Sequence, residues 1–235
     1  ADNDEDEDDE DEVGVPDNAE GDADIIAYGE APAVSVGSSD DIQIGAVSGD
    51  ESGHGLSVRG RIRGVGVYED VDAAALVLGG QGGAVDVAGG IGISGTVSAT
   101  SDGGNAVALR LAEGASTPEL VNSGSIRAGG GNAEGTAAEA VAIESGASLS
   151  EIRNSGAIEA VTAEEGTAYA IVDRSGTVGL VVNDRTITAR GGEDGRNIAI
   201  DLSANAGGAI IRQSAAEEGG PDRTIQGDIR LGGGA

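Results

Sequence analysis

The sequence contains no Cys, Met, Trp or Phe, and its only aromatic residues are Tyr28, Tyr68 and Tyr169. Large aromatic side chains, which bury roughly 150–250 Å² each, usually dominate the cores of compact domains. Because 38% of the 235 residues are still apolar, the composition favours a thin structure whose layers need only small aliphatic side chains. The lack of Cys excludes disulfides, thiol catalysis and thiolate metal sites.

Basic residues are also scarce, and all 13 of them are Arg. Against 42 Asp and Glu they leave a net charge of −29. We therefore expect neither nucleic acid nor an anionic membrane surface as a partner, because both bind basic patches. No stretch approaches the roughly 20 apolar residues of a membrane-spanning helix, so we expect no direct membrane insertion. Divalent cations are the natural counterions.

The acidic residues are concentrated at the start of the chain. Residues 1–12 contain ten Asp and Glu, a run that repels itself and favours disorder. Residues 13–33 resemble a linker around one apolar patch, 25–28. From residue 34 short apolar runs alternate with polar residues between glycines, which is typical of strands and turns. We predict an irregular acidic extension over 1–33 and an all-β domain over 34–235.

Two motifs recur in step at intervals of about 30 residues. The first is VRGRI, ISGTV, NSGSI, NSGAI, NDRTI and IQGDI, which end at Ile62, Val97, Ile126, Ile158, Ile187 and Ile229. The second centres on an alanine, at Ala75, Ala108, Ala142, Ala170 and Ala199. Such periods are typical of solenoids, in which each turn is stabilised by its neighbours. The pattern predicts a parallel β-solenoid of about five to six turns with three strands per turn.

Strand alternation assigns residues of these motifs to inner and outer columns. If the aliphatic residue of the first motif faces inward, the alanine two places later does too, at Ala99, Ala128, Ala160 and Ala189. The second motif predicts an inner column of Leu76, Leu109, Ile143, Ile171 and Ile200. Its predicted outer column is Val77, Arg110, Glu144, Val172 and Asp201. Opposite charges on adjacent turns are predicted to pair, Arg127 with Glu159 and Arg110 with Glu144.

An amide residue stands four positions before the first motif's aliphatic residue, at Asn122, Asn154 and Asn183, with Gln213 in a comparable segment. Amide side chains stacked in successive layers can hydrogen-bond along the stack. We predict an amide ladder at a bend of the solenoid. The alternative is that Asn is simply common in turns.

Glycine-rich acidic loops between the two motifs are predicted to emerge on one edge of the solenoid. Ca²⁺ takes roughly six to eight oxygen ligands, and these loops offer Asp102, Glu134, Glu164, Glu165, Glu193 and Asp194. The N-terminal run offers a second set of candidate ligands, Asp2, Asp4, Asp6, Asp8 and Asp9. The alternative is diffuse counterion screening of an acidic surface.

The recurring alanines of the second motif form a further candidate site. If the Leu or Ile after each one faces inward, Ala75, Ala108, Ala142, Ala170 and Ala199 face outward. Five small residues would then make a flat strip that another backbone could approach, a possible interface for self-association. The alternative is that the strip packs beneath the chain's own loop or faces the interior.

Catalysis has little support in the sequence. His54 is the only histidine and lies in a turn-like Ser-Gly-His-Gly stretch, which favours an ordinary loop residue over the base of a catalytic triad. Carboxylate pairs for glycoside hydrolysis are uninformative where acids are this abundant. We predict no enzyme activity and no catalytic residue. The alternative is a polysaccharide-active enzyme, which requires acids and Arg to converge in one groove.

The segments NSGSI-x-A and NSGAI-x-A, the Asn column and the closing TIQGDIRLGGG at 224–234 resemble the passenger regions of autotransporters and related bacterial surface proteins. The resemblance covers about 56–234, and this sequence does not include a β-barrel translocator after it. We expect either a piece of a longer precursor or a solenoid that is a free unit. It implies a right-handed parallel β-helix at the surface of a Gram-negative-type bacterium. We expect an extracellular structural or adhesive protein that self-assembles, with surface polysaccharide or a host receptor as further partners. A monomeric passenger stalk is the remaining alternative.

Overall fold

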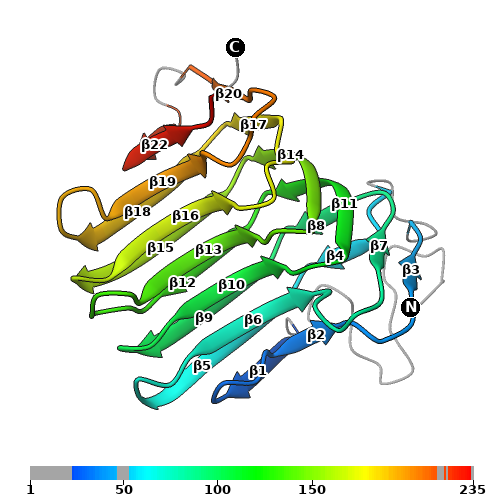
Figure 1. The fold of residues 1–235 in the computed structure, drawn as a ribbon, viewed down its shortest axis with the longest axis horizontal. Coiled ribbons are helices and arrows are strands. Elements are labelled where there is room, and N and C mark those ends of the chain that lie inside the picture. Colours follow the sequence, from blue (N-terminus) through cyan, green and yellow to red (C-terminus); the bar gives the residue numbers. More distant parts are fainter. Residues whose placement is uncertain (1–22, 47–52, 216–219, 221, 234–235) are drawn as a thin grey trace, which may run out of the picture.

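The computed structural model describes residues 23–46, 53–215, 220 and 222–233, and these residues form strands and turns without a helix. The strands make three parallel sheets, two with seven strands and one with eight (Figure 1). The chain passes through the sheets in turn, and each new turn stacks on the one before. The predicted fold class is confirmed: the protein is a parallel β-solenoid of about five turns.

The strands of each sheet follow in spatial order. Sheet 1 contains β1 (Asp24–Tyr28), β5 (Arg61–Glu69), β9 (Thr96–Asp102), β12 (Ser125–Gly129), β15 (Ala157–Glu164), β18 (Thr186–Gly192) and β21 (Thr224–Gln226). Sheet 2 contains β2 (Val34–Val36), β6 (Ala73–Leu78), β10 (Ala106–Leu111), β13 (Ala137–Ile143), β16 (Thr167–Asp173), β19 (Asn197–Leu202) and β22 (Asp228–Leu231). Sheet 3 contains β3 (Ile42–Ile44), β7 (Val85–Val87), β11 (Ala115–Asn122), β14 (Ser148–Asn154), β17 (Leu180–Asn183) and β20 (Ile210–Gln213), with β4 (Leu56–Val58) beside β8 (Ile91–Ile93) and β8 beside β11.

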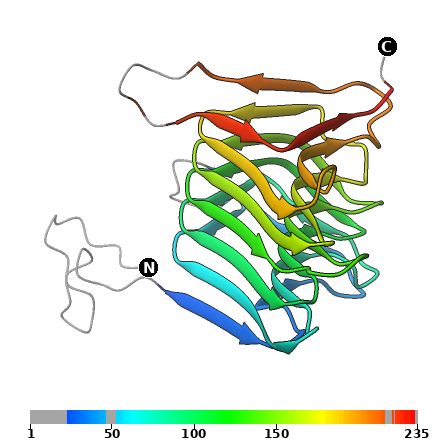
Figure 2. The same cartoon turned by 90° about the vertical axis from the view of Figure 1, so that its left-hand side faces the viewer.

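The stack begins earlier than the sequence suggested. Strand β1 lies inside the segment 13–33 that resembled a linker, and it pairs in parallel with β5, Ile25 opposite Ile62. Figure 2 shows β1 at one end of the stack and the strands β20 to β22 at the other. The apolar patch at 25–28 is therefore the first strand of sheet 1. The acidic run 1–12 lies outside the described residues.

The interior of sheet 1 follows the predicted columns. Val97, Ile126, Ile158 and Ile187 align directly on successive strands and are fully buried. The alanines two places later, Ala99, Ala128, Ala160 and Ala189, form the next buried column. The last copy of the first motif is corrected: Ile187 pairs with Ile225, and Ile229, which ends that copy, belongs to sheet 2. The reason is that β21 ends at Gln226 and β22 of sheet 2 begins at Asp228, so Ile229 already lies in the next strand.

Sheet 2 corrects the predicted register by two residues at one turn. Leu109 pairs with Val141 and Arg110 with Ala142, so Val141 replaces Ile143 in the inner column. By the same shift Ala142 replaces Glu144 in the column of Arg110. The segment 138–143 reads Ala-Glu-Ala-Val-Ala-Ile, which matches the motif in two registers, and only strand pairing decides between them.

The recurring alanines face the interior, which overturns the predicted surface strip. The registers on either side align Ala75, Ala108, Ala140, Ala170 and Ala199, all fully buried. In each strand the alanine and the aliphatic residue after it both join the core, so the alternation reverses at this point. A small side chain fits because two consecutive residues share the interior. Ala142, which the sequence placed in this strip, is also fully buried.

Glycines form a column of their own where the chain turns from sheet 3 to sheet 1. A Cβ added at Gly95, Gly124 or Gly156 would overlap the carbonyl oxygen of the corresponding glycine one turn earlier, Gly60, Gly95 or Gly124. Backbone thus packs directly on backbone at this corner. This close approach explains the glycine of the NSG segments, because any side chain would push successive turns apart.

We expect Gly124→Ala to lower the free energy of unfolding by about 2–3 kcal/mol, since the added methyl forces a backbone shift in a packed stack. Urea unfolding followed by circular dichroism measures the change. Gly45→Ala is the matched control, because among the described residues no atom beyond its own chain neighbours lies within 4 Å of a Cβ at that position. Equal effects of the two substitutions would contradict this account of the glycine column.

Candidate functional site

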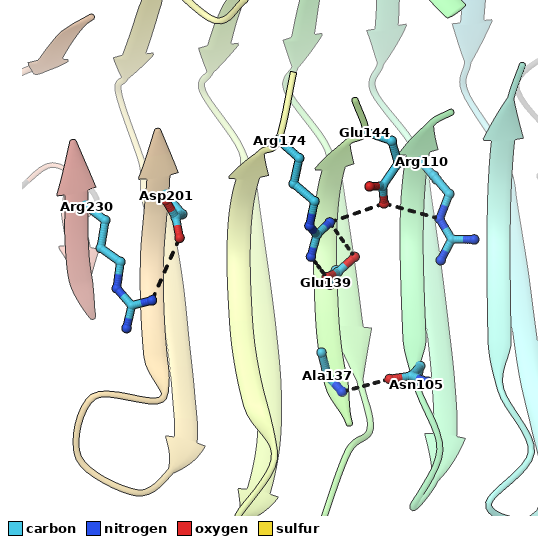
Figure 3. Close-up of polar contacts among 8 residues, drawn as sticks. All are labelled: Asn105, Arg110, Ala137, Glu139, Glu144, Arg174, Asp201 and Arg230. Atoms are coloured by element: carbon cyan, nitrogen blue, oxygen red, sulfur yellow. Dashed lines mark hydrogen bonds and ion pairs between the residues drawn. The ribbon is translucent and has the colours of Figure 1, made fainter. Parts of the chain in front are cut away.

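A cluster of acids and arginines lies on the outer face of sheet 2 (Figure 3). It comprises Arg110 on β10, Glu139 on β13, Glu144 just after β13 and Arg174 just after β16. Glu139 stands between Val107 and Tyr169 of the neighbouring strands. Four side chains from three turns therefore meet because the strands stack in register. We refer to these residues as the acid–Arg cluster.

Arg174 is at the centre of the acid–Arg cluster. Its guanidinium donates to both carboxylate oxygens of Glu139 and, through Nη1, to Glu144 Oε1 at 3.2 Å. Glu144 Oε1 also lies 3.9 Å from Nε of Arg110. The Glu139 side chain is only 8% exposed, and a carboxylate this deeply buried needs a partner to be tolerated. Arg174 is that partner.

The electrostatics of the cluster keep Arg174 charged. Burial alone would lower the pKa of Arg174, but the hydrogen bond and charge of Glu139, with Glu144 and Tyr169 adding to them, raise that pKa above its ordinary value. The guanidinium also lies 5.9 Å from the centroid of the Tyr169 ring, within cation–π range. Arg174 is thereby fixed as a permanent bridge between two turns.

The cluster borders a small apolar patch outside the main core. Val107, Ala142 and Val172 are buried there, and Tyr169 packs against them. A cavity of about 200 Å³ opens beside this patch. It is lined by Val107, Ala137, Asp72, Asn105 and the four residues of the acid–Arg cluster. Five of its lining residues are charged, and two, Val107 and Ala137, are apolar.

One rim of the cavity is held by Asn105. Its backbone N and its Nδ2 donate to Asp72 Oδ1 at 2.8 and 3.1 Å, while its Oδ1 accepts from the backbone N of Ala137 at 2.9 Å. These bonds connect three successive turns. The rim is therefore positioned by the strand stack itself.

Arg110 is less well satisfied than Arg174. Within the described part of the chain it makes no hydrogen bond, and its Nε is buried without a hydrogen-bond partner. A buried donor left in this state costs about 1–3 kcal/mol. The sequence predicted the contact of Arg110 with Glu144, but it gave no sign of Glu139 or Arg174. Asp201 and Arg230 form a similar pair at 3.8 Å further along the same face (Figure 3).

The amide residues form a continuous ladder inside the bend after sheet 3. Nδ2 of Asn122 donates to Asn154 Oδ1 at 2.7 Å, Asn154 to Asn183 at 2.7 Å, and Asn183 to Gln213 at 2.8 Å. The three asparagines are buried. The ladder begins at Asn122 because the previous turn has Ile93 at this position, which leaves Asn122 Oδ1 without a partner.

The candidate calcium ligands do not converge where they can be located. Asp102, Glu134, Glu165, Glu193 and Asp194 are exposed around the connections from sheet 1 to sheet 2, where β15 also ends at Glu164. Within the described residues, no group of three or more His, Asp or Glu is close enough to hold a metal ion. Asp2, Asp4, Asp6, Asp8 and Asp9 lie outside the described residues.

His54 lies in a loop, as predicted, and this loop packs against the outer side of β8. It is buried, and its imidazole occupies the space that a side chain at Gly92 would need. A cavity of about 240 Å³ beside it is lined by Ser57, Arg59, Ser94 and Ser123 among others. The histidine therefore packs against the sheet.

In comparisons with protein-family models, curated proteins and solved structures, nothing matches this chain. In the described part of the chain, no helix is long and apolar enough to cross a membrane. The fold and the contacts described above are therefore the basis for any functional proposal.

Proposed function

We propose that this chain is an extracellular structural protein, a β-solenoid rod whose copies associate end to end. The observation that carries the proposal is that the strands at the two ends of the described stack are apolar and match one another in register. The resemblance of the NSG repeats to bacterial surface proteins supports the extracellular location. Adhesion to a surface polysaccharide or a host receptor is compatible with such a rod.

Exposed apolar side chains gather at the ends of the stack. Ile25, Ile26 and Tyr28 on β1 are exposed at one end, and Ile210, Ile229 and Leu231 on β20 and β22 at the other. Only Val67 and Tyr68 join them elsewhere in the described residues. Strand edges with apolar side chains and unpaired backbone groups are templates for pairing with another chain.

The two ends are complementary because the inner columns run through the whole stack. Ile25 begins the sheet 1 column that ends at Ile225, and Val34 begins the sheet 2 column that ends at Ile229. A second copy with its β1 against β21 and its β2 against β22 continues both columns. Sheet 3 ends one turn earlier, at β20, so the joint runs through sheets 1 and 2.

Outward neighbours across this joint bring no like charges together. In the same register Asp24 would lie beside Thr224, Ile26 beside Gln226, and Ser35 beside Arg230. The net charge of −29 still opposes association over longer range. Salt screens such repulsion, with a Debye length of about 8 Å at physiological ionic strength. We therefore propose that association strengthens with ionic strength, and that Ca²⁺ assists it.

Cross-linking tests the proposed joint directly, because the chain has no native cysteine. Neighbouring strands lie about 4.8 Å apart, within the Cα separation of about 4.4–6.8 Å that a disulfide requires. Mixed and oxidised Ile26→Cys and Gln226→Cys chains are expected to give a heterodimer on a non-reducing gel. In the control pair, Tyr28→Cys with Gln226→Cys, the residues are two positions out of register, about 8 Å apart, and should cross-link poorly.

Two results would reject the head-to-tail joint. Cross-linking only between identical variants would indicate a symmetric dimer in its place. Absence of cross-links, together with monomers by light scattering at every salt and Ca²⁺ concentration, would leave the monomeric stalk as the better description.

One observation favours a second function, a polysaccharide-active enzyme. Acids and arginines converge beside one cavity, as that alternative requires, but both Glu139 and Glu144 accept hydrogen bonds from Arg174. Release of reducing ends from a polysaccharide, lost in Glu144→Gln, would establish this function. No release by the wild-type chain would dismiss it.

A further inference from the structure

We infer that the cavity beside Arg110 binds a single uncharged sugar unit. The cavity is lined by the acid–Arg cluster on the outer face of sheet 2, and Figure 3 shows the residues of this cluster. Its lining comes from strands β10 and β13 and from turn residues beside β6, β10, β13 and β16, in the middle of the stack. The inference is therefore independent of the proposed association at the ends.

The lining offers both hydrogen-bond acceptors and donors to a ligand. Asp72, Glu139 and Glu144 contribute three carboxylates, and Arg110 and Arg174 contribute two guanidinium groups. Carboxylates only accept hydrogen bonds when ionised, and guanidinium groups only donate. A hydroxyl does both, so a polyhydroxylated ring can satisfy the two kinds of wall at once.

Charge argues for a neutral ligand. The lining carries one more negative than positive group, and the whole chain carries −29, so an anionic sugar is repelled. A cationic ligand would meet Arg110 and Arg174 at close range. An uncharged sugar avoids both penalties.

Arg110 is the group that would orient a bound sugar, because it has donors that no group in the described part of the chain uses. Arg174 already uses its donors on Glu139 and Glu144, whereas Arg110 makes no hydrogen bond among the described residues. Its neighbours in register are Val77 and Ala142, neither of which has a side-chain acceptor. The Nε of Arg110 is buried, so a sugar hydroxyl would accept instead from the outer nitrogens of this side chain, which is 36% exposed.

The volume and the apolar lining residues of the cavity fit one sugar ring. Its volume of about 200 Å³ is below the roughly 300–1,000 Å³ of sites for drug-sized ligands. Val107 and Ala137 form apolar parts of the lining, against which the C–H face of a pyranose can pack. The bonds of Asn105 to Asp72 and Ala137 hold the rim in place before the ligand arrives.

Heteronuclear NMR titration tests the site. D-glucose, D-galactose and D-mannose serve as neutral probes, D-galacturonate as the anionic probe and D-glucosamine as the cationic probe. We expect saturable shifts of the Ala137 backbone amide and the Asn105 side-chain amide with at least one neutral probe, in the millimolar range. Arg110→Gln should weaken this binding by roughly tenfold or more, because a hydrogen bond to a charged donor is lost.

Arg127→Gln is the matched control, since Arg127 pairs with Glu159 on the outer face of sheet 1 at 3.7 Å, away from the cavity. It should leave the sugar affinity unchanged. Unaltered urea midpoints of both variants would show that the fold is retained. No saturable shift with any neutral probe, tighter binding of galacturonate or glucosamine, or an equal loss in Arg127→Gln would each overturn the inference.

Discussion

Asn154→Ala is expected to lower the free energy of unfolding by about 3–5 kcal/mol, because it removes the central rung of the amide ladder. Nδ2 of Asn154 donates to Asn183 Oδ1 at 2.7 Å and to the backbone oxygen of Thr186 at 3.0 Å, while its Oδ1 accepts from Asn122. Asn154 is 1% exposed. Water therefore cannot readily replace the lost partners, and several buried polar groups are left unsatisfied at once.

Urea unfolding monitored by circular dichroism measures this effect, and Gln213→Ala provides the comparison. Gln213 is the last rung and is exposed, so its loss should cost less than about 1 kcal/mol. A similarly small loss of unfolding free energy for Asn154→Ala would show that the ladder does not stabilise the bend. Solenoids unfold by neighbour interactions, so a second transition in Asn154→Ala would indicate that the stack has been divided at this turn.

The sequence was most informative where each turn offers one possible alignment. The Asn and Gly of the NSG segments recur beside a single aliphatic residue, and strand alternation then placed Ile126 and Ile158 inside and Arg127 and Glu159 outside, as the structure has them. The fold class follows from these columns. Predicting the fold class required only the spacing of the repeats, with no knowledge of which strands pair.

The second motif could not be aligned in the same way. Alanines at Ala138, Ala140 and Ala142 allow a shift of two residues that keeps every apolar residue in place, so only strand pairing fixes the register. The motif also places Ala140 and Val141 both inside. Simple alternation therefore gives the wrong side for the alanines.

The acid–Arg cluster could not be predicted from the sequence, for a different reason. Glu139 and Arg174 are 35 residues apart and belong to no recurring column, because Arg174 follows the end of β16 and reaches back across a turn. Their contact depends on side-chain length and on the corrected register. Only Arg110 and Glu144, which the motif already placed on adjacent turns, could be paired in advance.

Ala170→Arg is expected to prevent stable folding, with a loss of more than about 4 kcal/mol, because it places a charged side chain in the narrow aliphatic interior. Ala170 is fully buried among residues of the core, beside Ile171. The same substitution at Thr188, which faces outward between Ile187 and Ala189 on β18, should cost less than about 1 kcal/mol. Thermal unfolding and the solubility of the two variants measure the difference. If Ala170→Arg stayed folded and only reduced association between copies, the alanines would form a surface strip after all. Because all five aligned alanines are buried, we expect Ala170→Arg to unfold the core before any effect on association could be seen.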